Sequence, residues 1–363
     1  MTDQRFNDDL LLSERDQRLT QKSYPTLFPV LDFPELRNLF LEYDKSANVA
    51  KVRRRLAGEA AILFGVCALL GASAEPLYDN LAPFWKSVVG IVLAGCGIAS
   101  VIIGAFGAFS EKSKEQWLRG RLMTERLRQF QFQMLVRRAP SVFAAMAGPV
   151  AAEEFRELRL SWFSSFRIGY EEHLSSKLIE ALNEEQEEEF WLHPDEGLPD
   201  LDSPQAKAFF SAYRVLRIEY QIQYANYKLR KGGLSSVHRQ IVVLTQISLI
   251  SILVVFVLHI LIAFSLISFF KPWIDVADAH WVHVLIIWTA ICALTARAFE
   301  EGLQPTREQE RYRSYCASLA SMRRRFDDAV PSEKFQVIRE IEHAVYTEMI
   351  KFLKTNDEAR FVL

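Results

Sequence analysis

The chain has 363 residues, which leaves room for more than one domain. Half of its residues are hydrophobic and 24% are charged, and the formal net charge of -2 indicates no class of partner. The four cysteines stand at no spacing that metal ligands or redox pairs use, which argues against both kinds of site. The apolar residues are concentrated in four stretches almost free of charge, a distribution typical of membrane proteins.

Four membrane-spanning helices are predicted, at about residues 56–77, 87–110, 240–270 and 279–296. Residues 1–20 lack the apolar core of a signal peptide, so we expect the first span to direct insertion. The first span has a short uncharged core for a bilayer about 30 Å thick, whereas the third is long enough to require tilting. A core helix of a soluble protein can be this apolar, but four such helices in two close pairs are not expected there. We therefore predict an all-α integral membrane protein with two hairpins and long cytoplasmic helical extensions.

Basic residues mark the cytoplasmic side of the predicted spans. Lys and Arg cluster before the first and third spans and after the second and fourth, whereas the loops within the pairs carry only Lys86 and Lys271. Because positive charge stays on the cytoplasmic side, we expect both termini and the central region in the cytoplasm, and the spans in a bacterial inner membrane. Nucleotide or nucleic-acid binding is the weaker interpretation of these flanking clusters.

The resulting organisation has five blocks. We predict a cytoplasmic N-terminal segment, a first hairpin unit, a cytoplasmic linker with an acidic loop, a second hairpin unit and a cytoplasmic C-terminal helix. Their boundaries are residues 1–44, 45–140, 141–208, 209–330 and 331–363.

The two halves of the chain share a pattern, which predicts an internal duplication. An apolar stripe follows each pair of spans, and both stripes step by four, three and four residues, so each forms one face of a helix. A shift of 192 residues superimposes Met123, Leu127, Phe130 and Met134 on Tyr315, Leu319, Met322 and Phe326. The same shift carries the second span onto the fourth, so a hairpin with its extensions is the predicted repeating unit.

Glycines recur every seven residues in the first two spans, at Gly58 and Gly65 and at Gly90, Gly97 and Gly104. A small residue every second turn lets two helix backbones approach closely along one seam. We therefore expect these glycines to pack helices within a hairpin or between subunits. A wide aqueous pore lined by glycine is the alternative.

The third span contains the polar residues Thr245, Ser248, Ser251 and His259. Polar and ionisable groups at this depth are costly and face protein or water, so these residues either line a conduction path or bond to a neighbouring helix. Apart from Arg297 at an interface, the spans lack the charged residues expected of a coupled transporter, which favours a passive pore or a scaffold over a pump.

No combination of residues indicates catalysis, so we predict that the protein is not an enzyme and needs no cofactor or metal. His280 and His283, with Asp275 and Asp278, provide the weak alternative of a metal site in the second outer loop. The acidic run 184–189 is interpreted as a solvated helix end.

The best candidates for binding an anionic ligand such as a nucleotide are arginines that stand away from the spans: Arg137, Arg138, Arg323, Arg324 and Arg325. Their alternative interpretation is solvated helix surface. The apolar, proline-containing segment from Leu27 to Phe33 is a second candidate interaction region, through which a non-conducting scaffold or sensor would dock a cytoplasmic partner.

Two helices that flank predicted spans carry a pattern of aromatic, Arg and Glu residues. The helix before the third span contains Arg217, Ile218, Glu219, Tyr220 and Gln221, followed by Tyr224 and Tyr227. The helix after the second span contains Trp117, Arg121, Glu125, Leu127 and Arg128. The pattern resembles the helices that lead into and out of the hairpin in the SLATT family, whose two-span membrane effectors accompany SMODS nucleotidyltransferases and SLOG sensors in bacterial conflict systems. Because the resemblance covers about residues 45–140 and 210–330, the chain looks like a tandem or expanded form.

The second copy departs from this pattern. Where the first copy has Trp117, Arg121, Glu125 and Arg128, the second has Gln309, Arg313, Ala317 and Ala320. Only the arginine is retained, so the two copies need not both bind a ligand. What the resemblance implies is a homo-oligomeric pore in the lipid bilayer. The sequence does not give the number of subunits, and a tetramer is one candidate. A nucleotide or short oligonucleotide from a partner nucleotidyltransferase would gate it from the cytoplasm and so arrest infected cells in anti-phage defence.

Overall fold

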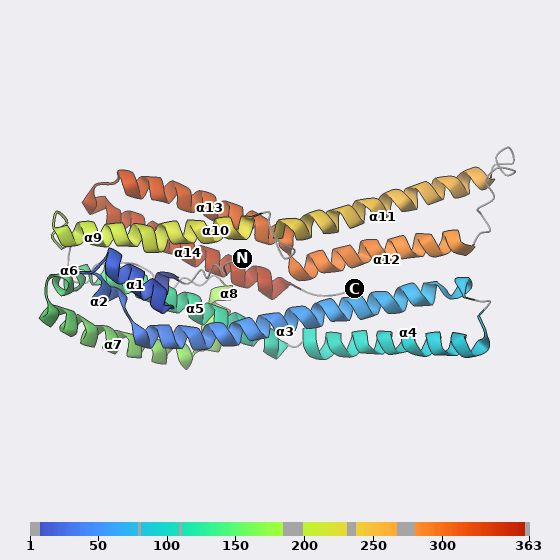
Figure 1. Ribbon diagram of the computed structural model, residues 1–363, viewed down its shortest axis with the longest axis horizontal. Helices are drawn as coiled ribbons and strands as arrows, with labels where there is room; N and C mark the ends of the chain where they lie inside the picture. Colours follow the sequence, from blue (N-terminus) through green and yellow to red (C-terminus); the bar gives the residue numbers. More distant parts are fainter. Residues whose placement is uncertain are drawn as a thin grey trace. The chain divides into compact units, whose positions relative to one another are not determined.

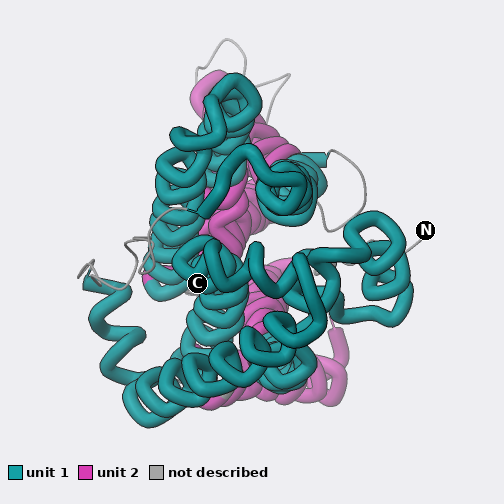
Figure 2. Tube along the Cα trace, turned by 90° about the vertical axis from the view of Figure 1, so that its left-hand side faces the viewer, with its two compact units in different colours: residues 1–49, 115–230, 310–357 teal, residues 50–114, 231–309, 358–363 magenta. Residues whose placement is uncertain are grey.

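The computed structural model describes residues 8–78, 81–108, 111–183, 199–230, 237–266 and 280–359. Every regular element in these ranges is a helix, which confirms the predicted all-α fold (Figure 1). The chain divides into two compact units, each assembled from separate stretches of sequence (Figure 2). Unit 1 comprises Met1–Val49, Glu115–Arg230 and Glu310–Asp357, and unit 2 comprises Ala50–Lys114, Lys231–Gln309 and Glu358–Leu363. The predicted blocks are contiguous in sequence, whereas these units are interleaved along the chain.

Unit 1 holds the amphipathic helices. They are a 3-10 turn (Asp8–Leu10), α1 (Glu14–Ser23), α2 (Phe28–Leu31), the first part of α3 (Pro34–Ser73), most of α5 (Glu111–Arg137), α6 (Ala139–Ala147), α7 (Pro149–Glu171), α8 (Leu174–Leu182), α9 (Pro204–Tyr213), α10 (Tyr220–Leu229), most of α13 (Pro305–Asp328) and α14 (Pro331–Glu358). A π-helical turn, Arg214–Glu219, joins α9 to α10. Proline begins α7, α9 and α14, where a first turn leaves its backbone N–H groups without a helical partner.

The two predicted apolar stripes both lie in the core of unit 1. Met123 and Leu127 belong to one buried cluster, and Met134 belongs to a larger one together with Leu319 and Phe326 of the second stripe. Burial of these large side chains removes apolar surface from water, which is the main favourable term in folding. The repeated stripes therefore pack unit 1.

The segment predicted to dock a partner is also part of this core. Leu27, Val30 and Phe33 are at most 3% exposed. Arg159 of α7 donates from Nη1 to the carbonyl oxygen of Val30 (2.5 Å) and from Nη2 to that of Asp32 (2.8 Å). The docking hypothesis for this segment is therefore wrong, because α7 covers it. The apolar composition of the segment indicates that it is buried. The sequence alone does not show whether this chain or another protein buries it.

Unit 2 holds the apolar helices. They are the second part of α3, a 3-10 turn (Glu75–Leu77), α4 (Pro83–Ile103) with the π-helical turn Gly104–Ala108, α11 (Val237–Leu266) and α12 (His280–Leu303). Four helices in the described chain are long and apolar enough to cross a membrane, over Pro34–Ser73, Pro83–Phe106, Val237–Phe264 and His280–Asp328. At most 28% of the apolar window of each is buried within the chain. Apolar faces exposed to this extent indicate a membrane protein.

These helices extend beyond the predicted spans. α3 has 40 residues and begins at Pro34, not near residue 56. At about 1.5 Å per residue it measures about 60 Å, twice the thickness of a hydrocarbon core. Hydropathy identifies only the part of such a helix that is compatible with lipid. Charged residues end the apolar span, but the helix itself continues through them. The acidic run 184–189, Asp275 and Asp278 lie outside the described residues.

Within unit 2 the apolar helices pack in pairs. α11 lies beside α12, and α4 lies beside α3 (Figure 1). Ser100 Oγ of α4 donates to the carbonyl oxygen of Ala61 at 2.7 Å. Trp288 Nε1 of α12 donates to the carbonyl oxygen of Leu70 at 3.0 Å, which ties α12 to α3. Hydrogen bonds of this kind satisfy polar groups where water is absent.

Candidate functional site

A cavity of about 580 Å³ in unit 1 is lined by cations and aromatic rings, and we call it the basic cleft. Its basic residues are Arg126, Arg137, Arg138, His173 and Lys177. Its aromatic residues are Phe130, Trp162, Phe166 and Tyr170. Among the described residues that line it, none is Asp or Glu. The cleft is therefore suited to an anionic ligand.

Helical periodicity explains how α5 and α7 form the walls of the basic cleft. On α5, residues 126, 130, 133 and 137 recur every three or four positions and so share one face. On α7, residues 162, 165, 166 and 169 do the same. Each helix thus turns a face with both polar and aromatic side chains toward the cavity.

The rings hold the cations of the basic cleft in place. The guanidinium of Arg138 lies 4.4 Å from the centroid of the Trp162 ring, and that of Arg126 lies 4.9 Å from the centroid of Tyr170. Lys177 Nζ lies 5.7 Å from the same Tyr170 centroid. Gln133 Nε2 is buried without a hydrogen-bond partner among the described residues. Cations for phosphates, rings for stacking and a buried amide donor match the chemistry of a nucleotide.

The basic cleft contains two of the five arginines predicted to bind a ligand, Arg137 and Arg138. The other three, at positions 323–325, lie on α13 and do not line it. Arg325 pairs instead with Glu340, with its Nη2 atom 3.0 Å from Oε1.

Sequence reasoning missed Arg126, His173 and Lys177 of the basic cleft. Arg126 is 4% exposed, and a buried arginine looks like any other charged helix residue until its tertiary neighbours are known. The spacing of Arg126, Arg137 and the aromatic residues could have identified one face of α5 as part of a site. Spacing alone does not identify the residues of α7 that face it.

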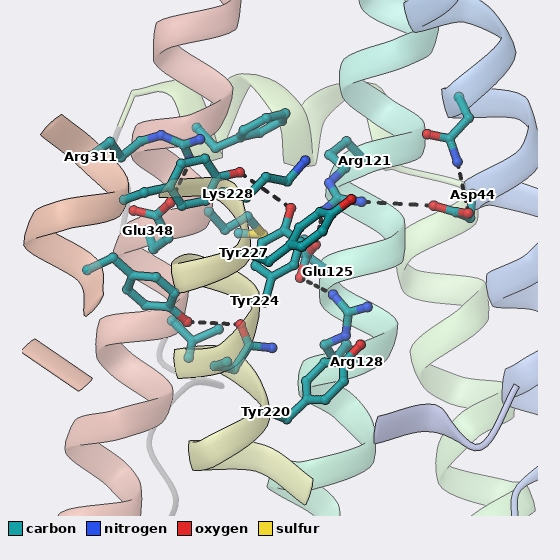
Figure 3. A pocket seen from close by; sticks show the side chains of 17 residues that line it. Asp44, Arg121, Glu125, Arg128, Tyr220, Tyr224, Tyr227, Lys228, Arg311 and Glu348 are labelled. Carbon is teal, nitrogen blue, oxygen red and sulfur yellow. Dashed lines mark hydrogen bonds and ion pairs between the residues drawn. The ribbon is translucent and has the colours of Figure 1, made fainter. Parts of the chain in front are cut away.

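A second cavity in unit 1, of about 250 Å³, brings together the helix after the second predicted span and the helix before the third (Figure 3). Seven residues of the aromatic, Arg and Glu pattern line it: Arg121, Glu125, Arg128, Tyr220, Gln221, Tyr224 and Tyr227. α13 and α14 also contribute to the lining, with Arg311, Tyr312 and Glu348 among their polar residues. We call this cavity the tyrosine pocket. Because α5 follows the first pair of apolar helices and α10 precedes the second, the pocket joins the two predicted copies.

The remaining residues of the aromatic, Arg and Glu pattern pack within unit 1. Arg217 forms an ion pair with Glu342 at 2.6 Å, and both side chains are buried. Trp117 packs edge to face on Phe352, with 6.1 Å between the ring centroids. Leu127 and Ile218 belong to the core, and Glu219 pairs with Arg214.

Charges within the tyrosine pocket shift two pKa values. Burial alone would raise the pKa of Glu125, but the guanidinium groups of Arg128 and Arg121 lower it to about 2. Burial would likewise raise the pKa of Tyr224, and the cations of Lys228 and Arg121 lower it below its ordinary value. Both shifts indicate a positive local potential, which favours the anionic form of a group.

In unit 2, two of the predicted pore residues share a groove of about 380 Å³ between α11 and α12. Ser251 and His259 of α11 line it together with Thr289, Ala290 and Ala293 of α12. The groove is otherwise apolar. It therefore places polar groups on a surface whose other residues are compatible with lipid.

The four polar candidates of α11 are placed differently. His259 is exposed within the chain, and its Nδ1 lies 2.8 Å from the carbonyl oxygen of Val255. Thr245 is exposed and Ser248 is half-buried, and neither lines the groove. Only His259 and Ser251 of this set come together.

The five predicted packing glycines also differ in their surroundings. A Cβ added to Gly97 would lie 3.8 Å from the Cβ of Ala68 on α3, whereas one added to Gly90 would meet nothing within 4 Å. Gly58 and Gly104 are buried, and Gly65 is half-buried. Gly97 thus lies at the α3–α4 contact, and Gly90 lies away from it.

Outside the two cavities, the metal alternative finds no support among the described residues. His280 and His283 are exposed on the first turn of α12. In the described part of the chain, no three His, Cys, Asp or Glu side chains come close enough to hold a metal ion.

We compared the chain with known protein families, curated proteins and solved structures. No protein-family model, curated protein or solved structure matches the chain.

Proposed function

We propose that the chain is an oligomeric membrane pore, an ion-channel effector of a bacterial anti-phage system that is gated from the cytoplasm. Unit 2 forms the conducting part in the inner membrane, and unit 1 is the cytoplasmic sensor on the same side as both termini. The signal is a nucleotide or short oligonucleotide from a partner nucleotidyltransferase. The biological setting rests on the resemblance to SLATT-type effectors, such as the membrane effector of the Hailong anti-phage system.

The observation that carries the conducting part is the groove of unit 2. Four helices expose apolar faces suited to lipid, yet Ser251, His259 and Thr289 share one face of α11 and α12. Ser251 is buried and Thr289 is half-buried, whereas His259 is exposed. A polar group exposed to hydrocarbon is costly, so His259 faces water or another protein. In an oligomer, this face lines a water-filled path.

The basic cleft supports the sensing part of the proposal. It has five basic side chains, aromatic walls and no carboxylate among its described lining residues. α5 forms one wall, and this helix begins at Glu111, directly after the apolar helix α4 and its π-helical turn. A ligand that prefers one position of α5 would therefore shift the equilibrium between conducting and non-conducting states.

Conduction is tested with full-length protein in liposomes that contain a pH- or potassium-sensitive dye. Thr289→Ala should change the ion flux or its selectivity, because Thr289 lines the groove. Thr295→Ala is the matched control: both hydroxyls bond to a carbonyl four residues earlier on α12, and only Thr289 lies in the groove. Flux that is absent under every ligand condition, or unchanged by Thr289→Ala, would count against the pore.

Ligand binding is tested separately with fluorescently labelled short oligonucleotides. Arg138→Gln should weaken binding about tenfold, the effect of losing one charge-assisted contact of about 1.4 kcal/mol. The control is Arg156→Gln, which removes an exposed arginine of α7 that pairs with Glu153 outside the cleft. Equal binding by both variants would exclude the basic cleft as the oligonucleotide-binding site. Binding without any conduction would favour the alternative function, a non-conducting membrane scaffold or sensor.

A further inference from the structure

One cation of the tyrosine pocket has no carboxylate partner in the described part of the chain. Each of its three carboxylates lies beside an arginine: Asp44 and Glu125 beside Arg121, at 3.9 and 2.6 Å, and Glu348 beside Arg311, at 2.5 Å. Arg128 lies 2.8 Å from Glu125 and 2.8 Å from Asp9, a buried carboxylate outside the lining. Lys228 is the remaining cation of the lining, and no carboxylate of the described chain pairs with it.

The ammonium of Lys228 lies 5.5 Å from the centroid of the Tyr224 ring, at the wall of the pocket. The hydroxyl of Tyr224 lies 3.4 Å from that of Tyr312, so two hydroxyl groups stand near the cation. Figure 3 shows Tyr224 and Lys228 on the same wall. The lowered pKa of Tyr224 agrees with a positive potential at this point. An ammonium together with hydroxyl donors is a common binding arrangement for a phosphate group.

The size of the pocket limits the ligand. Its volume of about 250 Å³ lies below the range of roughly 300–1,000 Å³ that is usual for drug-sized molecules. A single phosphate group with a short substituent fits such a volume. A whole nucleotide is better suited to the larger basic cleft.

Three lining residues of the tyrosine pocket lie close in sequence to the apolar part of the chain. Asn48, Lys228 and Arg311 line it, and each lies within two residues of a point where the chain passes between unit 1 and unit 2. Tyrosine is enriched at membrane–water interfaces because one end of its side chain is apolar and the other is polar. Basic pockets at the cytoplasmic ends of membrane helices bind anionic lipid headgroups.

We propose that the tyrosine pocket binds a phosphate group through Lys228, Tyr224 and Tyr312, and that the headgroup of an anionic phospholipid supplies it. The inference rests on the membrane placement in the proposed function, but not on conduction. Free inorganic phosphate has the same chemistry, so the experiment must separate the two sources.

The test uses full-length protein purified in a neutral, delipidating detergent, with the midpoint of thermal unfolding as readout. Phosphatidylglycerol, phosphatidylcholine and inorganic phosphate are titrated separately at constant ionic strength. Phosphatidylglycerol should raise the midpoint of the wild type saturably, and Lys228→Gln should need about tenfold more lipid for half the effect. Lys207→Gln, at an exposed lysine of α9 outside the pocket, should respond like the wild type.

Lys228→Arg keeps the charge and should keep most of the response, which separates lost binding from a damaged fold. A response to inorganic phosphate alone that depends on Lys228 would support the phosphate site and assign it to free phosphate. Two results would overturn the site: equal responses of the wild type and Lys228→Gln, or an equal effect of phosphatidylcholine. A lipid response in protein that conducts no ions would leave this inference standing and remove the pore.

Discussion

At the scale of single residues, the buried pair of Arg217 and Glu342 stabilises unit 1. Arg217 donates from Nε and Nη2 to the two carboxylate oxygens, at 2.8 and 2.6 Å. Tyr213 donates to the same carboxylate at 2.7 Å, and the guanidinium lies 4.7 Å from the centroid of Phe132. In the sequence Arg217 belongs to a pattern that suggests ligand binding, whereas the structure gives it an internal partner 125 residues away.

Glu342→Gln should lower the free energy of unfolding by about 3–5 kcal/mol, because it leaves the Arg217 charge buried without a counter-ion. The double variant Arg217→Met with Glu342→Leu should lose less than the single variant, since neither charge then remains. Thermal or denaturant unfolding in detergent measures both. Arg18→Gln, at an exposed pair with Glu14, should change little. A single variant as stable as the double would contradict this account.

Glu125 predicts a defined dependence of stability on pH. Its pKa is about 2 in the folded chain, against an ordinary value of 4.5. A lowered pKa stabilises the fold above the ordinary value, and this contribution is lost as the pH falls from about 4.5 to about 2. The difference corresponds to about 3 kcal/mol.

Glu125→Gln should therefore be less stable than the wild type at pH 7 and equally stable near pH 2. The measurement is the unfolding midpoint of both proteins across this pH range. Both proteins are made with Asp9→Asn, because the pKa of Asp9 is raised mainly by burial and also by the charge of Glu125. A difference that stays constant from pH 7 to pH 2 would show that Glu125 is not ionised as described.

At the scale of elements, the α3–α4 contact shows what a glycine pattern can and cannot predict. Heptad spacing identified Gly97, which faces Ala68, but also Gly90, which faces open space. It missed Gly71, where an added Cβ would lie 2.1 Å from Leu93 Cδ2 of α4. Periodicity defines a helix face, whereas the point of closest approach depends on the crossing of two helices and on the neighbour's side chain.

Gly71→Ala should destabilise the protein by about 1–3 kcal/mol relative to Gly90→Ala, because only the first crowds a packed neighbour. Both substitutions raise helix propensity equally, so the comparison isolates packing. Unfolding in detergent is the measurement. Adding Leu93→Ala to Gly71→Ala should relieve the crowding. Equal stability of the two alanine variants would show that α3 and α4 do not pack at this point.

Helix type and the apolar faces could thus be predicted from local sequence, because they depend on periodicity and hydropathy. The walls of the basic cleft could not, since Arg138 meets Trp162 and Arg126 meets Tyr170 only after α5 and α7 pack. The segment 27–33 shows the same limit, because its apolar residues fit a core and a docking surface equally well. Long-range pairing decides between the two.

At the scale of the whole molecule, the two units group residues by solvent and not by order in the chain. α3 contributes to both units, and unit 2 collects the apolar parts of α3, α4, α11 and α12. A helix that passes from polar to apolar sequence must change its surroundings along its length. Polar and apolar stretches alternate along this chain. A unit that collects the apolar stretches and a unit that collects the polar ones are therefore interleaved in sequence.

The proposed orientation of these units is tested by labelling single cysteines in spheroplasts with a membrane-impermeant maleimide. The background lacks the native thiols Cys67, Cys96, Cys292 and Cys316. Leu81→Cys, at an exposed position between η2 (Glu75–Leu77) and α4, should react in intact spheroplasts, because basic flanks place this connection outside. Asp200→Cys, exposed in unit 1 ahead of α9, should react only after permeabilisation. Permeabilised samples, in which both must react, control for accessibility, and the reverse pattern would place the basic cleft beyond the reach of a cytoplasmic signal.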